Sequence, residues 1–362
     1  MTAAEQLVRA IASGIPAHSR PRYREEWLAD VEGARELGIS RASVVLGAAA
    51  TAITMDRVDP VVTGMPRVAL AARRLRWALA MVGVAAVLAV GTSVGWGAGS
   101  SGMYPPAFES LVRGAAPVAS GLAVVFLVVG VVALLWVVPA AGIRRSALMV
   151  AAVLGGFVLL AIGVVFTNLL GVALVLVGAA IGVVILAQER GLDADPAPAR
   201  RRIVGIVAGG VLATITVGVL GVAHILVWNP LAKVPGRTLE QIYADMAAAG
   251  EGTGWLFIAI WCACWFAGCV VLVVSAIRSR RAGTLRVRRA LAASLMLVGL
   301  TIVTSWFAGF GMGMGLADTF MTSGYDAAIS GPILIMVGQA AIIGAILVAV
   351  PPRRVPEAVT AG

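Results

Sequence analysis

The chain has 362 residues, of which 60% are apolar, 13% are charged and 43 are glycine, and its formal net charge is +10. Its length alone would suit two or three soluble domains, but a soluble domain needs about 25% charged residues to cover its surface. The composition excludes that class. It predicts an all-α fold, a polytopic bundle of transmembrane helices.

The apolar runs of the sequence predict the spans of this bundle. A helix needs about 20 mostly apolar residues to cross the hydrocarbon core of a bilayer. The run over 147–187 has 41 residues without a charge, and one helix of that length would reach about 60 Å, twice the hydrocarbon thickness. It is therefore expected to fold back near Thr167-Asn168, as two spans or as a re-entrant hairpin. About eight spans are predicted over residues 75–350: 77–98, 116–138, 147–166, 169–187, 203–227, 255–277, 290–311 and 332–350.

The basic residues predict the orientation, because cytoplasmic loops of membrane proteins carry an excess of Lys and Arg. Of the 28 basic residues, 25 lie before the first span, in alternate loops or in the tail over 351–362. The opposite loops hold only Arg113, Lys233 and Arg237. The sequence thus predicts a multi-pass protein of the plasma (inner) membrane with both termini in the cytoplasm. Topology accounts for the positive charge, and no nucleic-acid partner is expected.

Residues 1–74 form the predicted cytoplasmic prefix. A helix is expected over 21–38, with proline in its first turn and an apolar row at every fourth position. Ser40 can cap a second helix that extends to about Asp56. Two helices of this size bury too little surface to be stable alone. We expect them to pack on a third helix over 4–12, on the membrane surface or on a partner.

Three motifs stand out in this prefix: Arg22-Tyr23-Arg24-Glu25-Glu26-Trp27-Leu28, then Glu36-Leu37-Gly38-Ile39-Ser40, then Leu46-Gly47. Over about 40 residues they resemble the short helical prefix of many actinobacterial multi-pass membrane proteins, and more loosely the HAAS or permease-prefix segment. Members of that group often accompany PadR-type regulators. The resemblance implies membrane-linked signalling or export, with a cytoplasmic regulatory protein bound through residues 1–70. The residues expected to dock that partner are Tyr23, Glu26, Trp27 and Asp30.

The sequence contains no recognisable catalytic set. Its only histidines are His18 and His224, and its three cysteines lie within one apolar run, over 262–269. No enzyme activity, metal or cofactor is therefore expected.

Two glycine patterns carry structural expectations. The alternating glycines over 309–315 lack the Lys-Ser/Thr pair of a phosphate loop, so they predict a flexible or unwound end of the seventh span. The pairs Gly178-x-x-x-Gly182 and Gly205-x-x-x-Gly209 predict close helix packing.

The predicted outer loop over 229–253 contains a capping box, Thr238-Leu239-Glu240-Gln241, followed by an apolar row at helical spacing. A short surface helix is expected here, either as simple cover or as a lid over a cavity. The outer loops hold six acidic residues against three basic ones, which would favour cations or cationic amphiphiles. Ligand-site candidates are His224, Trp228, Asp318 and Gln339, with helix–helix hydrogen bonds as the alternative for the residues within spans. Asp326 is expected to be an uninvolved loop residue.

Two classes of function stay open. No predicted span contains Asp, Glu, Lys or Arg in its central part, which argues against an ion-coupled transporter, since charges inside a membrane usually serve function. A membrane-anchored regulatory or partner-binding protein is slightly favoured. The alternative is a small-molecule or lipid-type permease or exporter.

The orientation can be tested by labelling cysteines in a background that lacks the native ones. A cysteine at Gly236 should react with an impermeant maleimide in sealed cells, because the charge asymmetry places that loop outside. A cysteine at Thr284 or Pro196 should stay unlabelled. Labelling at Pro196 in sealed cells would overturn the orientation.

Overall fold

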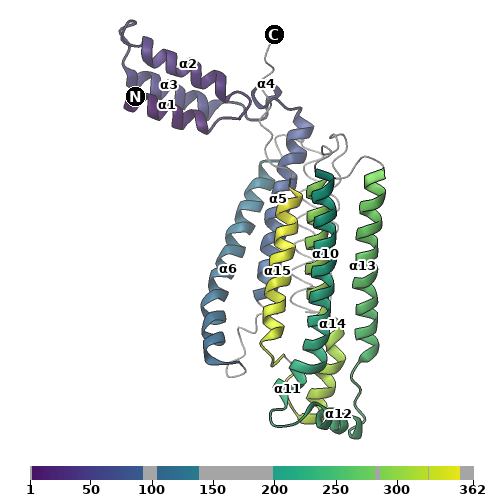
Figure 1. Cartoon of the computed structure of the whole chain (residues 1–362). Coiled ribbons are helices and arrows are strands. Elements are labelled where there is room, and N and C mark those ends of the chain that lie inside the picture. The colour runs from purple at the N-terminus through teal and green to yellow at the C-terminus, as the bar shows by residue number, and fades with distance from the viewer. Residues whose placement is uncertain (1, 93–103, 138–198, 282–285, 325, 351–362) are drawn as a thin grey trace. The chain divides into compact units, whose positions relative to one another are not determined.

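The computed structural model describes residues 2–92, 104–137, 199–281, 286–324 and 326–350. The all-α prediction is confirmed for this part of the chain, which consists of helices joined by turns and contains no strand (Figure 1). The predicted spans 147–166 and 169–187, the pair Gly178–Gly182 and the tail lie outside the described residues. The described chain falls into two compact units. The first consists of residues up to Trp77 together with 132–137, and the second consists of the described residues from 78 to 131 and from 199 to 350.

The first unit begins with three helices that pack on one another: α1 (Ala3–Ser13), α2 (Arg20–Gly33) and α3 (Arg41–Thr54). Thr2 and Glu5 form a capping box at the start of α1, and Ser40 caps α3 by accepting a hydrogen bond from the Ser43 backbone at 3.1 Å. Helix α1 supplies the apolar surface that α2 and α3 lack as a pair. The shared core consists of Val8, Ala12, Ile15, Trp27, Val31, Ala48 and Ala52.

A short turn of helix, α4 (Pro60–Thr63), leads into α5 (Arg67–Val90). Helix α6 (Pro106–Leu135) follows. Within the first unit, Val137 beyond the end of α6 is buried against Leu70 and Ala71 of α5. This small apolar cluster joins the end of α6 to the start of α5.

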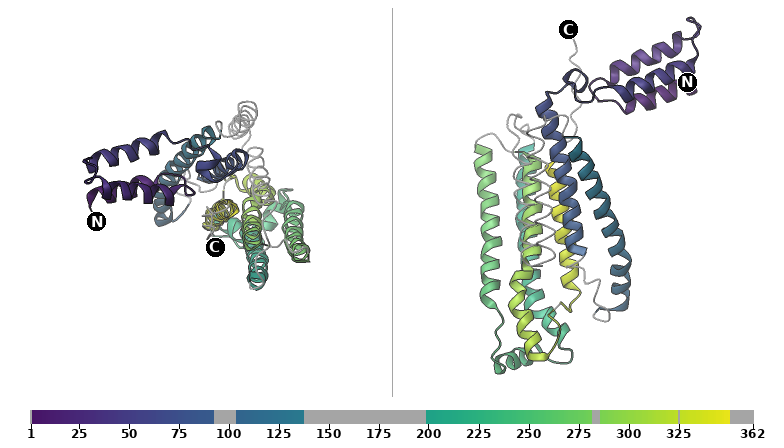
Figure 2. Two further views of the ribbon diagram at one scale, coloured as in Figure 1. Left: turned by 90° about the horizontal axis from the view of Figure 1, so that it is seen from above. Right: turned by 180° about the vertical axis from the view of Figure 1, so that it is seen from behind.

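The second unit is a bundle of long helices: α10 (Ala199–Ala223), α13 (Trp255–Arg281), α14 (Val287–Phe320) and α15 (Ser330–Ala349), together with most of α5 and α6. Helix α14 contacts α10, α13 and α15 (Figure 2). Five described helical segments are long and apolar enough to cross a membrane, as an integral membrane protein requires. They are Pro106–Leu135, Arg201–Lys233, Trp255–Ser279, Val287–Phe320 and Ser330–Ala349.

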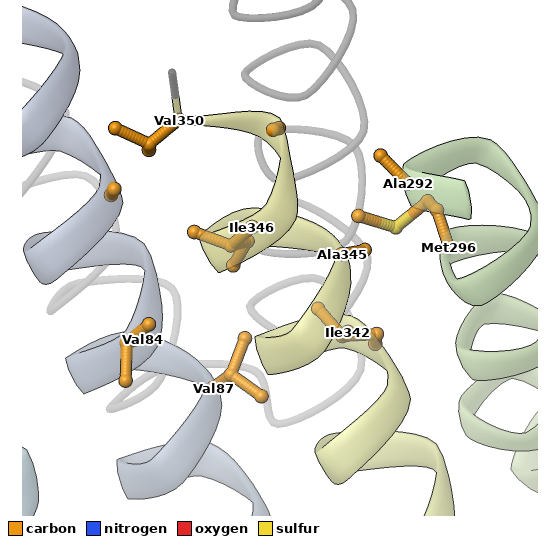
Figure 3. Packing of buried hydrophobic residues seen from close by; sticks show 10 residues of the cluster. Val84, Val87, Ala292, Met296, Ile342, Ala345, Ile346 and Val350 are labelled. Carbon is orange, nitrogen blue, oxygen red and sulfur yellow. The ribbon is translucent and has the colours of Figure 1, made fainter. Parts of the chain in front are cut away.

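One core of the bundle forms where α5, α14 and α15 meet (Figure 3). Val84 and Val87 of α5 face Ile342 and Ile346 of α15, and Met296 of α14 completes the contact. All five side chains are buried. The buried side chains of this core are all apolar, so its specificity depends on shape.

Close contact between α14 and α15 depends on Gly299. A Cβ atom there would lie 2.4 Å from Cγ1 of Ile342 and 2.9 Å from the carbonyl oxygen of Gly338. The pair Gly205 and Gly209, which the sequence marks for close packing, is exposed and meets no described atom within 4 Å. The tight approach in the described bundle thus lies elsewhere than the motif indicates.

The prediction of an unwound end over the alternating glycines is wrong, because α14 continues without a break to Phe320. Instead, these glycines admit neighbouring backbone: a Cβ on Gly311 would lie 2.8 Å from Cα of Gly254, and one on Gly315 would lie 2.9 Å from the Gly252 oxygen. Tertiary packing of this kind offsets the low helix propensity of glycine, about 1 kcal/mol per residue.

Most helices also begin or end beyond the predicted spans. Helix α5 starts ten residues before 77, and α10 and α14 include arginines at their first turns. The apolar criterion locates only the part of a helix that suits hydrocarbon, whereas the helix itself continues through charged turns into the interface.

Candidate functional site

The first candidate site lies at the end of the bundle where α10 stops being a regular α-helix. A π-helical turn, η2 (His224–Trp228), follows α10, and α11 (Asn229–Lys233) follows η2. In this turn the Asn229 backbone donates to the His224 carbonyl, five residues back. Single π turns inside helices are rare and are frequent at functional sites. Here the side chains of His224 and Asn229 contact Asp326, in the segment before α15.

Pro230 gives a physical reason for this turn. Proline has no N–H, so the carbonyl four residues earlier, that of Leu226, loses its helical partner. The hydroxyl of Tyr243, in α12 (Leu239–Ala248), donates a hydrogen bond to that carbonyl. Burial raises the pKa of the Tyr243 hydroxyl further above neutral, so this group is a protonated donor.

Helix α12 has the capping box that the sequence predicts: Thr238 accepts from the Gln241 backbone and Gln241 accepts from the Thr238 backbone. Its apolar face carries Ile242 and Met246, both buried against α14. Beside it, Trp261 of α13 donates to the Thr301 carbonyl of α14 at 3.1 Å.

Four polar side chains meet next to η2, and we call them the His224 cluster: His224, Asn229, Asp326 and Ser330. One ring nitrogen of His224, Nε2, lies 3.2 Å from Oδ2 of Asp326, and the other, Nδ1, lies 2.8 Å from Oγ of Ser330. Asn229 donates to Oδ1 of Asp326 at 3.2 Å and accepts from the backbone of Ala327 at 2.8 Å. The cluster therefore ties the α14–α15 connection to η2 and to the first turn of α15.

Contacts around the cluster leave it little room to rearrange. Gly331 packs directly on it, since a Cβ atom there would lie 2.7 Å from Oδ2 of Asp326 and 3.1 Å from Cε1 of His224. The Tyr104 hydroxyl donates to the Asp326 carbonyl at 2.9 Å, and Lys233 donates to the Ser323 carbonyl. His224 itself is 5% exposed.

A serine, a histidine and an aspartate in a hydrogen-bonded row also occur in nucleophilic catalysis. That chemistry needs free N–H groups to stabilise the oxyanion. In the first turn of α15, Pro332 has no N–H, and the N–H groups of Gly331 and Ile333 donate to the Ala328 and Ile329 carbonyls. The described surroundings thus suit a fixed polar clamp better than a reacting serine.

The structure places the predicted ligand-site residues in different surroundings. His224 contacts Asp326, the residue expected to be uninvolved, and Asp326 is thereby a member of the site. Asp318 is exposed on α14 and forms no hydrogen bond or ion pair with a described residue. Trp228 is partly exposed in η2. Gln339 lies elsewhere in the bundle, where it donates to the Val87 carbonyl of α5 at 2.8 Å.

The sequence carried no signal for Asp326, because a loop carboxylate 102 residues from its histidine follows no local spacing. The π turn could have been anticipated. Asn229-Pro230 directly follows the apolar run over 203–227, and a proline in a helix that continues there must free a carbonyl one turn earlier.

A pocket of about 410 Å³ lies near this end of the bundle, between η2, α12 and α13. None of the four His224 cluster residues lines it. Tyr243 borders the pocket, so α12 is placed as the lid interpretation requires, although gating itself stays a prediction. The pocket is lined by Leu226, Tyr243, Thr253, Trp255, Ile258 and Ala259.

The second candidate site is on the three-helix unit, where the predicted docking residues lie on α2. Trp27 is buried in the core, with the Tyr23 ring tilted against it at 5.4 Å between centroids. Glu26 is exposed and lies 3.8 Å from the guanidinium of Arg22, and Asp30 is exposed. Trp27 is therefore unavailable at the surface of this unit.

Helix α3 presents a more apolar surface than α2 does. Leu46 is 70% exposed and Ile53 is 80% exposed, seven positions apart and so on one side of the helix. After Arg41 the helix contains no charged residue.

Comparison with known proteins finds no matching family model, no matching curated sequence and no matching solved structure.

The His224 cluster predicts an unequal response of two aspartates. Asp326→Ala should lower the stability of the purified protein in detergent by about 1–2 kcal/mol, because Asn229 and His224 lose their shared acceptor. Asp318→Ala should change it by less than about 0.5 kcal/mol. Equal effects of the two substitutions on thermal unfolding would contradict the cluster.

The π turn predicts a double-mutant cycle. Tyr243→Phe should cost about 1–2 kcal/mol, because it leaves the Leu226 carbonyl without its donor. In a Pro230→Ala background the new N–H can serve that carbonyl, so the same substitution should cost much less. Tyr104→Phe is the control, since its loss should not depend on residue 230. A Tyr243→Phe cost that is the same in both backgrounds would refute the link.

Proposed function

We propose that this integral membrane protein is a plasma-membrane anchor, with about eight spans and cytoplasmic termini, that binds a soluble protein through its three-helix unit. The observation that carries the proposal is the exposed apolar side of α3, defined by Leu46 and Ile53. The unit has its own buried core. It can therefore present α3 as a preformed surface, which reduces the ordering cost of binding.

The composition of α3 supports a covered surface. Among its 14 residues only Arg41 is charged, whereas the neighbouring α2 carries seven charged residues in 14. A solvent-exposed helix of a soluble unit is usually charged on its outer face. An apolar face that stays exposed marks an interaction site.

The shape of this side favours a helix as the partner's contact element. Ser43, Gly47 and Thr51 form an exposed row of small residues at every fourth position, and nothing lies within 4 Å of the place a Cβ would occupy on Gly47. Leu46 and Ile53 lie along one side of this row. A row of small residues beside exposed apolar side chains allows the apolar face of an amphipathic helix to approach closely.

Site-specific photocrosslinking in intact cells tests the proposal. A benzophenone side chain at Leu46 should give one discrete protein adduct, because the partner covers that position. The same group at Arg24, on the charged surface of α2, should give none. Ile53→Glu should abolish the Leu46 adduct without changing the helicity of the unit. Crosslinking of Leu46 to lipid alone, or equal adducts at both positions, would contradict the proposal.

The pocket bordered by Tyr243 supports the second candidate, a permease for small apolar molecules or lipids. Its walls are largely apolar, and pockets for such ligands are usually of this size and character. Substrate efflux that is lost on Ile258→Trp, which fills the pocket, and kept on Ile53→Glu would favour the permease over the partner-binding protein.

A further inference from the structure

A dense group of arginines lies in the last part of the first unit, on the chain from Asp56 to Trp77. Between residues 56 and 77 the chain has five arginines and two aspartates, which leaves a formal charge of +3. We call the five arginines the arginine collar. They are Arg57, Arg67, Arg73, Arg74 and Arg76.

Two hydrogen bonds hold Arg74, the central arginine of the collar, in place. Arg74 donates through Nη1 to the Trp136 carbonyl at 2.7 Å and through Nη2 to the Arg57 carbonyl at 2.9 Å. The guanidinium thus links the end of α6 and the chain before α4 to the start of α5. Carbonyl oxygens accept these bonds without cancelling the charge of Arg74, so its guanidinium keeps a full positive charge.

Two arginines of the collar, Arg74 and Arg67, lie in electrostatically unfavourable surroundings. Burial, followed by the nearby charges of Arg73 and Arg57, lowers the pKa of Arg74, and Asp56 opposes this only in part. Arg67 is in the first turn of α5, which contains no acidic residue, and the dipole of a helix disfavours a cation at that end. A bound anion would relieve both costs.

Two tryptophans indicate that the anion is the phosphate of a membrane lipid. Trp77 is 38% exposed at the point where α5 becomes apolar, and Trp136 is 54% exposed beyond the end of α6. Tryptophan rings prefer the headgroup level of a bilayer, where one side is apolar and the other is wet. Arginines at that level meet lipid phosphates, which a guanidinium binds with two parallel hydrogen bonds.

We propose that the arginine collar is a binding site for the phosphate headgroup of an anionic phospholipid. Arg73 and Arg76, three positions apart on α5, supply the exchangeable contacts, and Arg74 positions the site through its two carbonyls. Trp77 and Trp136 lie along the glycerol region of the lipid. This site is independent of the partner surface on α3, and neither needs the other to be correct.

The test uses the full chain in nanodiscs that contain phosphatidylcholine with a small share of dansyl-labelled phosphatidylglycerol. Energy transfer from tryptophan to dansyl reports binding, and dansyl-labelled phosphatidylcholine gives the neutral reference. Arg73→Gln/Arg76→Gln should lower the preference for the anionic lipid roughly thirtyfold, because each arginine contributes about 1 kcal/mol at an anionic surface. Arg73→Lys/Arg76→Lys should keep most of it.

Matched controls separate this site from general charge. Arg22→Gln/Arg24→Gln removes the same charge from α2 and should leave the preference unchanged. Thermal unfolding should show that the collar variants are folded. An unchanged preference in Arg73→Gln/Arg76→Gln, or an equal loss in the α2 variant, would overturn the proposal. Full competition by inorganic phosphate at equal ionic strength would also overturn it, since the site would then bind free phosphate.

Discussion

Backbone polar groups inside an apolar helical bundle need partners within the protein, because hydrocarbon offers none. This constraint is visible wherever a described helix departs from the regular α pattern. At η2 the proline at position 230 removes one N–H, and the Tyr243 hydroxyl takes its place at the Leu226 carbonyl. At the end of α5, where Gly91 and Thr92 are π-helical, Gln339 donates to the Val87 carbonyl at 2.8 Å. In both places a polar side chain from another helix donates to a backbone carbonyl beside the irregular turn.

These side-chain hydrogen bonds also restrict which residues can lie next to each irregular turn. Gln339 can approach only because residue 91 is glycine, where a Cβ would lie 1.4 Å from Nε2. The His224 cluster can close only because residue 331 is glycine. Asn229 serves three groups at once, one carboxylate oxygen and the N–H groups of Ala327 and Ala328. Irregular helical turns therefore occur beside glycines and beside hydrogen-bonding side chains. A polar side chain must approach the backbone closely to make its bond in an apolar interior, and glycine leaves the space for it.

The sequence predicts what depends on local pattern. The long apolar runs of the sequence locate α10, α13, α14 and α15, and the capping box at Thr238 predicts α12. Both signals come from residues that are neighbours in the chain. It does not predict the pairing of His224 with Asp326, which depends on how three helix ends come together. It also misjudges the glycines of α14, because a glycine that loosens an isolated helix also lets Gly254 and Gly252 approach closely. Helix propensity is a local quantity, and close packing is not.

Burial separates the two candidate sites in kind. The His224 cluster is assembled from two segments far apart in the chain, and its His224 and Asn229 are buried, which suits a clamp between helix ends. The α3 surface comes from one helix, is exposed and contains no charge beyond Arg41. A buried polar network contributes to a unique arrangement of its own chain, whereas an exposed apolar row gains free energy only when another surface covers it. An exposed apolar surface on the three-helix unit is therefore the stronger basis for a proposal of partner binding, whereas the His224 cluster makes hydrogen bonds within its own bundle.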